Sequence, residues 1–149
     1  MKISIFIVTL SFLWINACSK ELNTEFGQGR VKFNQQKLSI DVEVAKTKQQ
    51  REVGLMNRTQ LAPDQGMLFV FDRNEIQRMW MKDTFIALDI LFISSQGKIV
   101  SVHKALQPCH QSPCKIYHSI YNAVYMLEIN AGIIERENIR AGQKLELYF

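Results

Sequence analysis

Cysteine and histidine residues gather in one short stretch of the chain. His103, Cys109, His110, Cys114 and His118 fall within sixteen residues, and thiolate and imidazole are ligands that zinc and copper prefer. Metal handling by Cys109, His110, Cys114 and His118 is therefore one interpretation. The spacing Cys-His-x-x-x-Cys is not a usual zinc-finger spacing, and two cysteines in an oxidising compartment most simply form a disulfide. We favour a disulfide between Cys109 and Cys114 and keep the metal site as the alternative.

A second group of residues combines an aromatic ring with charged and hydroxyl side chains. Trp80 and Lys82 are two residues apart, so in a strand they point to the same face. An indole beside an ammonium group and the hydroxyl of Thr84 suits a polar or anionic small molecule or a sugar. The full candidate binding set is Arg51, Arg58, Trp80, Lys82, Thr84, Asp89 and Glu128.

A structural interpretation of the same set is also open. Trp80 could belong to the core, and the two acidic residues could pair with the two arginines as buried ions. Buried charges need partners, because an uncompensated buried charge is strongly destabilising. Such pairing is expected whether or not a ligand binds.

The sequence lacks the short motifs of several enzyme classes. It has no Gly-x-Ser-x-Gly elbow, no His-Glu-x-x-His zinc motif, no phosphate-cradling glycine loop and no dinucleotide fingerprint. The residues therefore assign no catalytic group and no cofactor. A hydrolase with an unrecognised site stays a second alternative.

The segments that must position these residues are mostly strands. Lys37–Val44 alternates apolar and polar residues with the period of a half-buried strand. Thr47 and Gln50 have the spacing of a capping box, which predicts one short helix near residues 48–55. Leu106–Tyr121 holds two prolines and both cysteines and is expected to be a long loop. Further strands are predicted over Gln28–Phe33, Met67–Phe71, Ile76–Met81, Ala87–Ile93, Lys98–Val102, Ala123–Ile129 and Lys144–Phe149, with one turn of helix over Ile133–Glu137. This pattern predicts a mainly β fold, a single small β-sandwich or barrel.

The N-terminus has the layout of a secretory signal peptide over residues 1–17. Lys2 is followed by the apolar stretch Ile3–Ile15, which is too short to span a membrane as a helix. Ile15-Asn16-Ala17-Cys18 resembles the lipobox of bacterial lipoproteins. In that resemblance Cys18 becomes the first residue of the mature protein and carries lipid. Ser19 resembles the residue type that directs lipoproteins to an outer membrane.

Lipidation at Cys18 predicts both a membrane anchor and a location in the cell envelope. Each buried methylene of an acyl chain contributes about 0.8 kcal/mol to membrane binding, so several chains anchor a protein stably. We therefore expect a periplasmic protein with a lipid-anchored stalk over residues 18–29 and one β domain over residues 30–149. The other two cysteines then form an even pair, which supports the disulfide.

Charge limits the class of partner. The chain carries 18 basic and 14 acidic residues. Removing residues 1–17 takes away one lysine, which leaves 17 − 14 = +3. The basic residues are scattered rather than clustered, so we expect no nucleic-acid partner. The expected partners are the membrane and an unidentified small molecule or envelope protein.

Several sequence blocks in register resemble a known family, the bacterial and archaeal domain of unknown function 192. The resemblance runs from about Lys37 to Leu147 and implies a mainly β, jelly-roll-like fold. It supplies no activity, cofactor or catalytic residue. The blocks are REVGLMNR (51–58), GMLFVF (66–71), WMKDT (80–84) and LDILFI (88–93), followed by Pro108-Cys109, Cys114, Tyr117, Leu127-Glu128 and Ala131-Gly132. We interpret the chain as an uncharacterised envelope-anchored lipoprotein, a non-enzymatic binding or accessory module for a small molecule or another envelope component.

Overall fold

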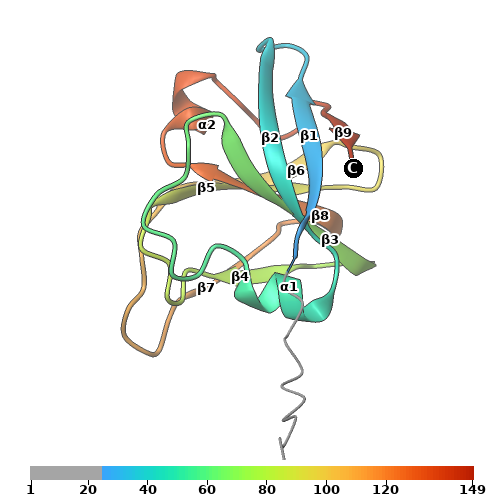
Figure 1. The fold of residues 1–149 in the computed structure, drawn as a ribbon. Coiled ribbons are helices and arrows are strands. Elements are labelled where there is room, and N and C mark those ends of the chain that lie inside the picture. The colour runs from blue at the N-terminus through green and yellow to red at the C-terminus, as the bar shows by residue number, and fades with distance from the viewer. Residues whose placement is uncertain (1–24) are drawn as a thin grey trace, which may run out of the picture.

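The computed structural model of the protein describes residues 25–149, which form two β-sheets and two short helices (Figure 1). The predicted signal peptide and the lipidation site Cys18 lie outside the described residues. No helix of the described part is long and apolar enough to cross a membrane. The elements are β1 (Gly27–Phe33), β2 (Leu38–Ala45), α1 (Lys48–Val53), β3 (Gln65–Glu75), β4 (Arg78–Trp80), β5 (Leu88–Ile93), β6 (Ile99–Leu106), β7 (Ile116–His118), β8 (Ala123–Asn130), α2 (Ile133–Arg136) and β9 (Glu146–Tyr148).

Seven of these strands form the main sheet, in the order β6-β5-β8-β3-β2-β1-β9, and β4 pairs with β7 separately. Neighbouring strands run antiparallel except β2 and β3, which are parallel. Parallel neighbours need a crossover connection, and α1 lies in it. As a result α1 lies with the β4–β7 pair at one end of the molecule, at the bottom of Figure 1, while α2 lies at the other end.

The central strands bury both of their faces. Every residue of β5 is buried, and successive side chains point to opposite faces of a strand. Leu91 and Ile93 belong to one apolar cluster, which includes residues of β1, β2 and α2. Ile90 and Phe92 belong to a second cluster, which includes Met79 of β4. Because both faces are covered, the fold is a β-sandwich-like arrangement, and the predicted mainly β class is confirmed.

The capping box predicted at the start of α1 is present. The backbone N–H of Gln50 donates to Thr47 Oγ1 at 3.1 Å, and the backbone N–H of Thr47 donates to Gln50 Oε1 at 2.9 Å. The helix ends at Val53 because Gly54 has a φ of 47° and donates its N–H back to the Gln50 carbonyl. It is thus slightly shorter than the predicted range 48–55.

Several segments differ from the sequence-based prediction. Strand β3 extends to Glu75 beyond the predicted Met67–Phe71, and β6 extends to Leu106 beyond the predicted Lys98–Val102. The expected loop Leu106–Tyr121 contains strand β7, which pairs with β4. The first strand begins at Gly27, so residues 27–29 of the predicted stalk are paired with β2. Strand β7 escaped the sequence-based prediction because a three-residue strand has too few residues to show an alternation.

Candidate functional site

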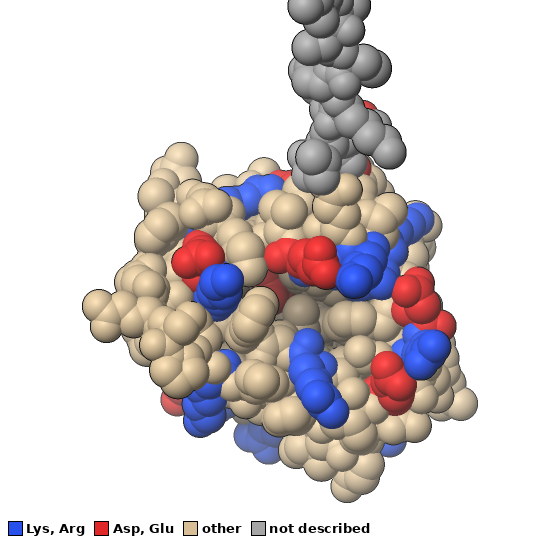
Figure 2. All heavy atoms as spheres, turned by 90° about the horizontal axis from the view of Figure 1, so that it is seen from below, with Lys and Arg blue, Asp and Glu red and all other residues tan. Residues whose placement is uncertain are grey.

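A pocket of about 240 Å³ lies between α1, β4 and the second apolar cluster. Figure 2 shows this end of the molecule, where a hollow is surrounded by basic and acidic side chains. The pocket is lined by Lys48, Arg51, Glu52, Val53, Gly54, Leu55, Met56, Phe69, Phe71, Arg78, Met79, Trp80, Lys82, Thr84, Met126 and Glu128. Five of the seven predicted binding residues are among them: Arg51, Trp80, Lys82, Thr84 and Glu128.

Glu128 is the unusual residue of this lining. It lies on β8 between β3 and β5, directly opposite Met67 and Ile90, which are both fully buried. Only 6% of Glu128 is exposed, and its carboxyl makes no hydrogen bond or ion pair within residues 25–149. Burial among apolar neighbours raises the pKa of this carboxyl to about 8. At neutral pH the protonated form therefore predominates when the pocket is empty.

Trp80 and Lys82 lie at the mouth of the pocket. The Lys82 ammonium is 5.4 Å from the centre of the Trp80 ring, so the two side chains share a face, as their spacing predicts. Trp80 is 49% exposed, which contradicts its interpretation as a core residue. The Trp80 ring and the Lys82 ammonium are thus exposed to solvent in the same pocket lining as the buried carboxyl of Glu128.

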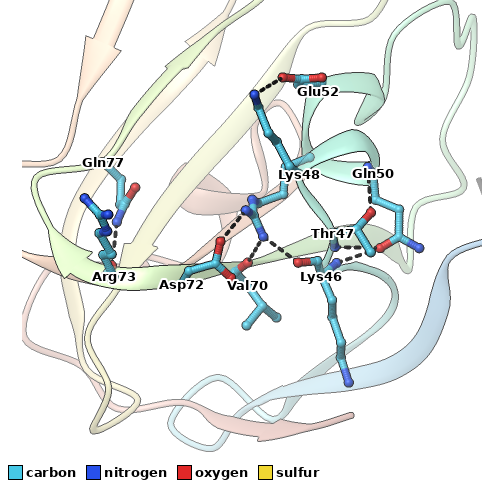
Figure 3. A network of polar contacts seen from close by, with 10 residues as sticks. Lys46, Thr47, Lys48, Gln50, Glu52, Val70, Asp72, Arg73 and Gln77 are labelled. Carbon is cyan, nitrogen blue, oxygen red and sulfur yellow. Dashed lines mark hydrogen bonds and ion pairs between the residues drawn. The ribbon is translucent and has the colours of Figure 1, made fainter.

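Arg51 borders the pocket, but its charge is already engaged. Its guanidinium donates to the Lys46 and Val70 carbonyls and to the Asp72 carboxylate, the last at 2.7 Å. Figure 3 shows Val70 and Asp72 on β3 beside α1. Arg51 therefore joins α1 to β3 and is better placed to shape the pocket wall than to bind a ligand.

Lys48 and Glu52 also line the pocket and form an ion pair with each other. The Lys48 ammonium lies 3.7 Å from the Glu52 carboxylate, one helical turn along α1 (Figure 3). Both side chains are largely exposed, so this pair is weak. It still balances the charge on the α1 side of the mouth.

Two predicted binding residues do not line the pocket. Arg58 donates two hydrogen bonds to the Glu43 carboxylate, at 2.5 and 2.6 Å, and these bonds raise the pKa of its guanidinium. Asp89 is fully buried and accepts 2.8 Å hydrogen bonds from the backbone N–H groups of Ala105 and Ile134. The expected pairing of the two acidic residues with the two arginines is therefore wrong, because Asp89 uses backbone donors and Glu128 uses none of the described groups.

The cysteines form the expected disulfide, with an S–S distance of 2.05 Å. The loop that it closes is attached to the chain beside Trp80. The backbone N–H of Cys109 donates to the Met81 carbonyl, and that of Asp83 donates to the Cys109 carbonyl, both at 3.0 Å. Thr84 Oγ1 adds a 3.4 Å hydrogen bond to the Lys82 carbonyl. The cross-linked loop therefore fixes the segment that carries Lys82.

The same disulfide removes the basis of the metal alternative. Cys109 and Cys114 offer no thiolate, which is the form that binds metal. His110 stacks on the ring of Phe85 at 5.0 Å, and His118 receives a 2.9 Å contact from His103 Nε2 at its backbone carbonyl. Within the described residues, no group of three or more His, Cys, Asp or Glu side chains is placed to hold a metal ion. The structure thus does not assemble the four residues into a ligand set.

Several lining residues escaped the sequence-based prediction. Met126 could have been found, since it is two residues from Glu128 in a predicted strand and shares its face. Arg78 and Met79 depend on the pairing of β4 with β7, and Phe69 and Phe71 depend on how α1 covers β3. Their place in the pocket is a tertiary property.

Comparison with known proteins identifies relatives of this fold. A crystal structure from Sinorhizobium meliloti 1021, described provisionally as a transcription regulator, has 38% sequence identity and a TM-score of 0.74 and covers 83% of this chain and 95% of its own. A protein of unknown function from Novosphingobium aromaticivorans DSM 12444 has 26% identity and a TM-score of 0.72, covering 81% and 84%. No curated protein gives a significant match. The model for domain of unknown function 192, described as an uncharacterised ACR, matches residues 30–147. The chain belongs to this family.

Proposed function

We propose that the protein is a small-molecule-binding module whose site is the pocket around Glu128. The observation that carries this proposal is a carboxyl that is 6% exposed, lines a pocket and has no partner among the described residues. Every fully buried side-chain nitrogen or oxygen of the described residues has a hydrogen-bond partner, so the unpartnered oxygens of Glu128 open into the pocket. A ligand in the pocket can take the place of water as their partner.

The position of Glu128 makes a purely structural role costly. Its neighbours across β3 and β5 are Met67 and Ile90, so an apolar side chain would fit the same place without a desolvation cost. Asp89 provides a contrast within the same sheet, because both of its carboxylate oxygens accept backbone hydrogen bonds. Asp89 thus has a structural task within the chain, and Glu128 is left for a ligand.

The rest of the lining supports a binding role. Aromatic and thioether side chains surround the carboxyl, while Trp80 and Lys82 stand at the mouth. Binding pockets commonly combine a mostly apolar wall with a few polar groups that orient the ligand. The pocket has this composition.

We further propose that the module is tethered to a membrane through lipid on Cys18. The support is the signal-like sequence before Cys18. Gln50 Nε2 donates to the Glu25 carbonyl at 2.6 Å, so the start of the described chain is joined to α1, beside the pocket. Glu25 is seven positions after Cys18, a length of chain that spans at most about 25 Å. A lipid on Cys18 would thus keep this end of the molecule near the membrane.

Binding can be tested with the fluorescence of Trp80. The chain has two tryptophans, Trp80 and Trp14, and Trp14 lies in the predicted signal peptide. In a Trp14→Phe protein in detergent, the fluorescence therefore reports on the pocket whether or not that peptide is removed. Amines, carboxylates, amino acids and monosaccharides are the probes, and calorimetry then measures any probe that shifts the emission. We expect at least one saturable binder, and we expect the added changes Trp80→Ala and Lys82→Ala to weaken its binding, as measured by calorimetry. No binder, or unchanged binding in the folded alanine variant, would show that the pocket is not a binding site.

The tether is tested separately by mass spectrometry. Full-length protein extracted from membranes should carry acyl mass on Cys18, and Cys18→Ser should release the protein into the soluble fraction. A protein without acyl mass, or one that stays in the membrane fraction after the substitution, would contradict the lipid anchor. This outcome would leave the pocket proposal untouched.

A further inference from the structure

The charged side chains of the pocket that form no ion pair within the described residues indicate the class of its ligand. We propose that the pocket takes a small zwitterion with an apolar body, whose ammonium group meets the Glu128 carboxylate and whose anionic group faces Arg78 and Lys82. This inference rests on the proposed function and specifies what binds at the same site.

The charges around the pocket fall into paired and unpaired groups. Six charged residues line it: Lys48, Arg51, Glu52, Arg78, Lys82 and Glu128. The three on α1 are engaged, since Lys48 pairs with Glu52 and Arg51 with Asp72. Within residues 25–149, Arg78 and Lys82 make no ion pair, and Glu128 makes no polar contact at all. What remains is the carboxyl of Glu128, which must ionise to pair with a cation, and two exposed or half-exposed cations, Arg78 and Lys82.

Only a ligand with both charges satisfies both ends. A simple cation would pair with Glu128 but would meet two uncompensated cations at the mouth. A simple anion would pair with Arg78 and Lys82 but would gain no ion pair with Glu128, whose carboxyl would keep its proton. A zwitterion places an ammonium group against the carboxylate and an anion against Arg78 and Lys82.

The apolar wall and the size of the pocket define the rest of the ligand. The lining also includes the apolar side chains of Phe69, Phe71, Met79 and Met126, which favour an apolar or aromatic body. The volume of about 240 Å³ is below the range of about 300–1,000 Å³ that is typical of sites for drug-sized ligands. The ligand is therefore of amino-acid size, and Trp80 beside Lys82 covers its outer end.

Binding of the ammonium group should be coupled to proton release. Burial raises the Glu128 pKa to about 8, and the carboxyl must ionise to pair with a cation. The other charged groups that face it are Lys48, Arg51 and Glu52 from α1, Arg78 from β4 and Lys82 just beyond β4; β3 and the rest of β8 contribute apolar side chains. The apparent affinity should therefore rise about fivefold to tenfold per pH unit from pH 6 to pH 8.

Matched probes test the ligand class directly. The full-length Trp14→Phe protein is titrated with leucine, with 3-methylbutylamine, which lacks the carboxylate, and with 4-methylpentanoate, which lacks the ammonium group. Phenylalanine, phenethylamine and 3-phenylpropanoate form a second series. We expect the zwitterion of at least one series to bind more than about 30-fold tighter than its carboxylate analogue. It should bind about threefold to fivefold tighter than its amine analogue, because the mouth cations are exposed.

Two substitutions assign the charges to residues. Glu128→Gln keeps the size of the side chain and should weaken zwitterion and amine binding more than about 30-fold without weakening carboxylate binding. Lys82→Met should reduce the advantage of the zwitterion over the amine, because only Arg78 is then left to face its anionic group. Lys115→Met is the matched control, since the Lys115 ammonium also lies over an aromatic ring, that of Tyr117 at 4.9 Å, but outside the pocket lining. It should change nothing.

The results separate this inference from the proposed function. Equal affinity for amine and zwitterion, or tightest binding of the carboxylate, would overturn the zwitterion while leaving the pocket as a binding site. Binding that is insensitive to Glu128→Gln would also overturn it. If no probe of either series or of the wider panel shifts Trp80 emission, the inference and the proposed function both fail.

Discussion

Replacing Glu128 with glutamine tests whether this carboxyl is buried without a partner. Glutamine has nearly the same shape but no charge. In the wild-type protein burial raises the Glu128 pKa from 4.5 to about 8, so the native state holds a proton on this residue that the unfolded chain has already lost. A group that binds more protons in the native state makes the free energy of unfolding fall as pH rises. The fall begins above the unfolded pKa and ends at the folded pKa.

The size of the effect follows from the two pKa values. Integrated between pH 5 and pH 8, the linkage relation gives a loss of about 3 to 4 kcal/mol of stability. The residue is 6% exposed, so solvent screening reduces this figure little. Glu128→Gln should lose none of this stability, so its advantage over the wild type should grow steadily across the same range.

Urea denaturation at a series of pH values measures the difference. Wild type, Glu128→Gln and the control Glu75→Gln are compared without ligand, using the same two-state analysis. Glu75 is exposed at the end of β3, so its replacement should leave the pH dependence of the wild type unchanged. If the curves of wild type and Glu128→Gln run parallel from pH 5 to pH 8, Glu128 titrates as a solvated residue and our account of the pocket is wrong.

Three further changes probe the frame around the pocket. Arg58→Met should lower the free energy of unfolding, measured by urea denaturation, by about 1 kcal/mol, because both hydrogen bonds to Glu43 are lost. A double-mutant cycle with Glu43→Gln that gives no coupling energy would contradict this. Thr47→Ala should cost about 1 kcal/mol through loss of the α1 cap, and an unchanged denaturation midpoint would show that the cap does not stabilise the domain. Replacing Cys109 and Cys114 with serine should lower the free energy of unfolding by about 2 kcal/mol, as expected for a short closed loop. The same change should weaken ligand binding, because the loop fixes the segment that carries Lys82. A variant as stable as the wild type would refute the stabilising role of the disulfide.

The sequence by itself determined the elements with a local cause. Period-two alternation predicted the strand that became β2, because one face of a half-buried strand meets the core. Thr47 and Gln50 predicted the start of α1, since both hydrogen bonds of a capping box join residues three positions apart. The disulfide followed from an even pair of cysteines. The shared face of Trp80 and Lys82 followed from strand geometry.

Only the tertiary structure decided which charges were left without partners. The sequence shows two acidic residues and two arginines, but it does not show that Arg58 meets Glu43, that Arg51 meets Asp72 or that Asp89 takes backbone donors. These choices depend on side chains that are brought together from separate strands and loops. Glu128 is isolated because Met67 and Ile90 flank it on the neighbouring strands, and strand order is set by long-range pairing. The pocket exists for the same reason: β4, α1 and β8 are far apart in the chain and meet only when the sheet is complete.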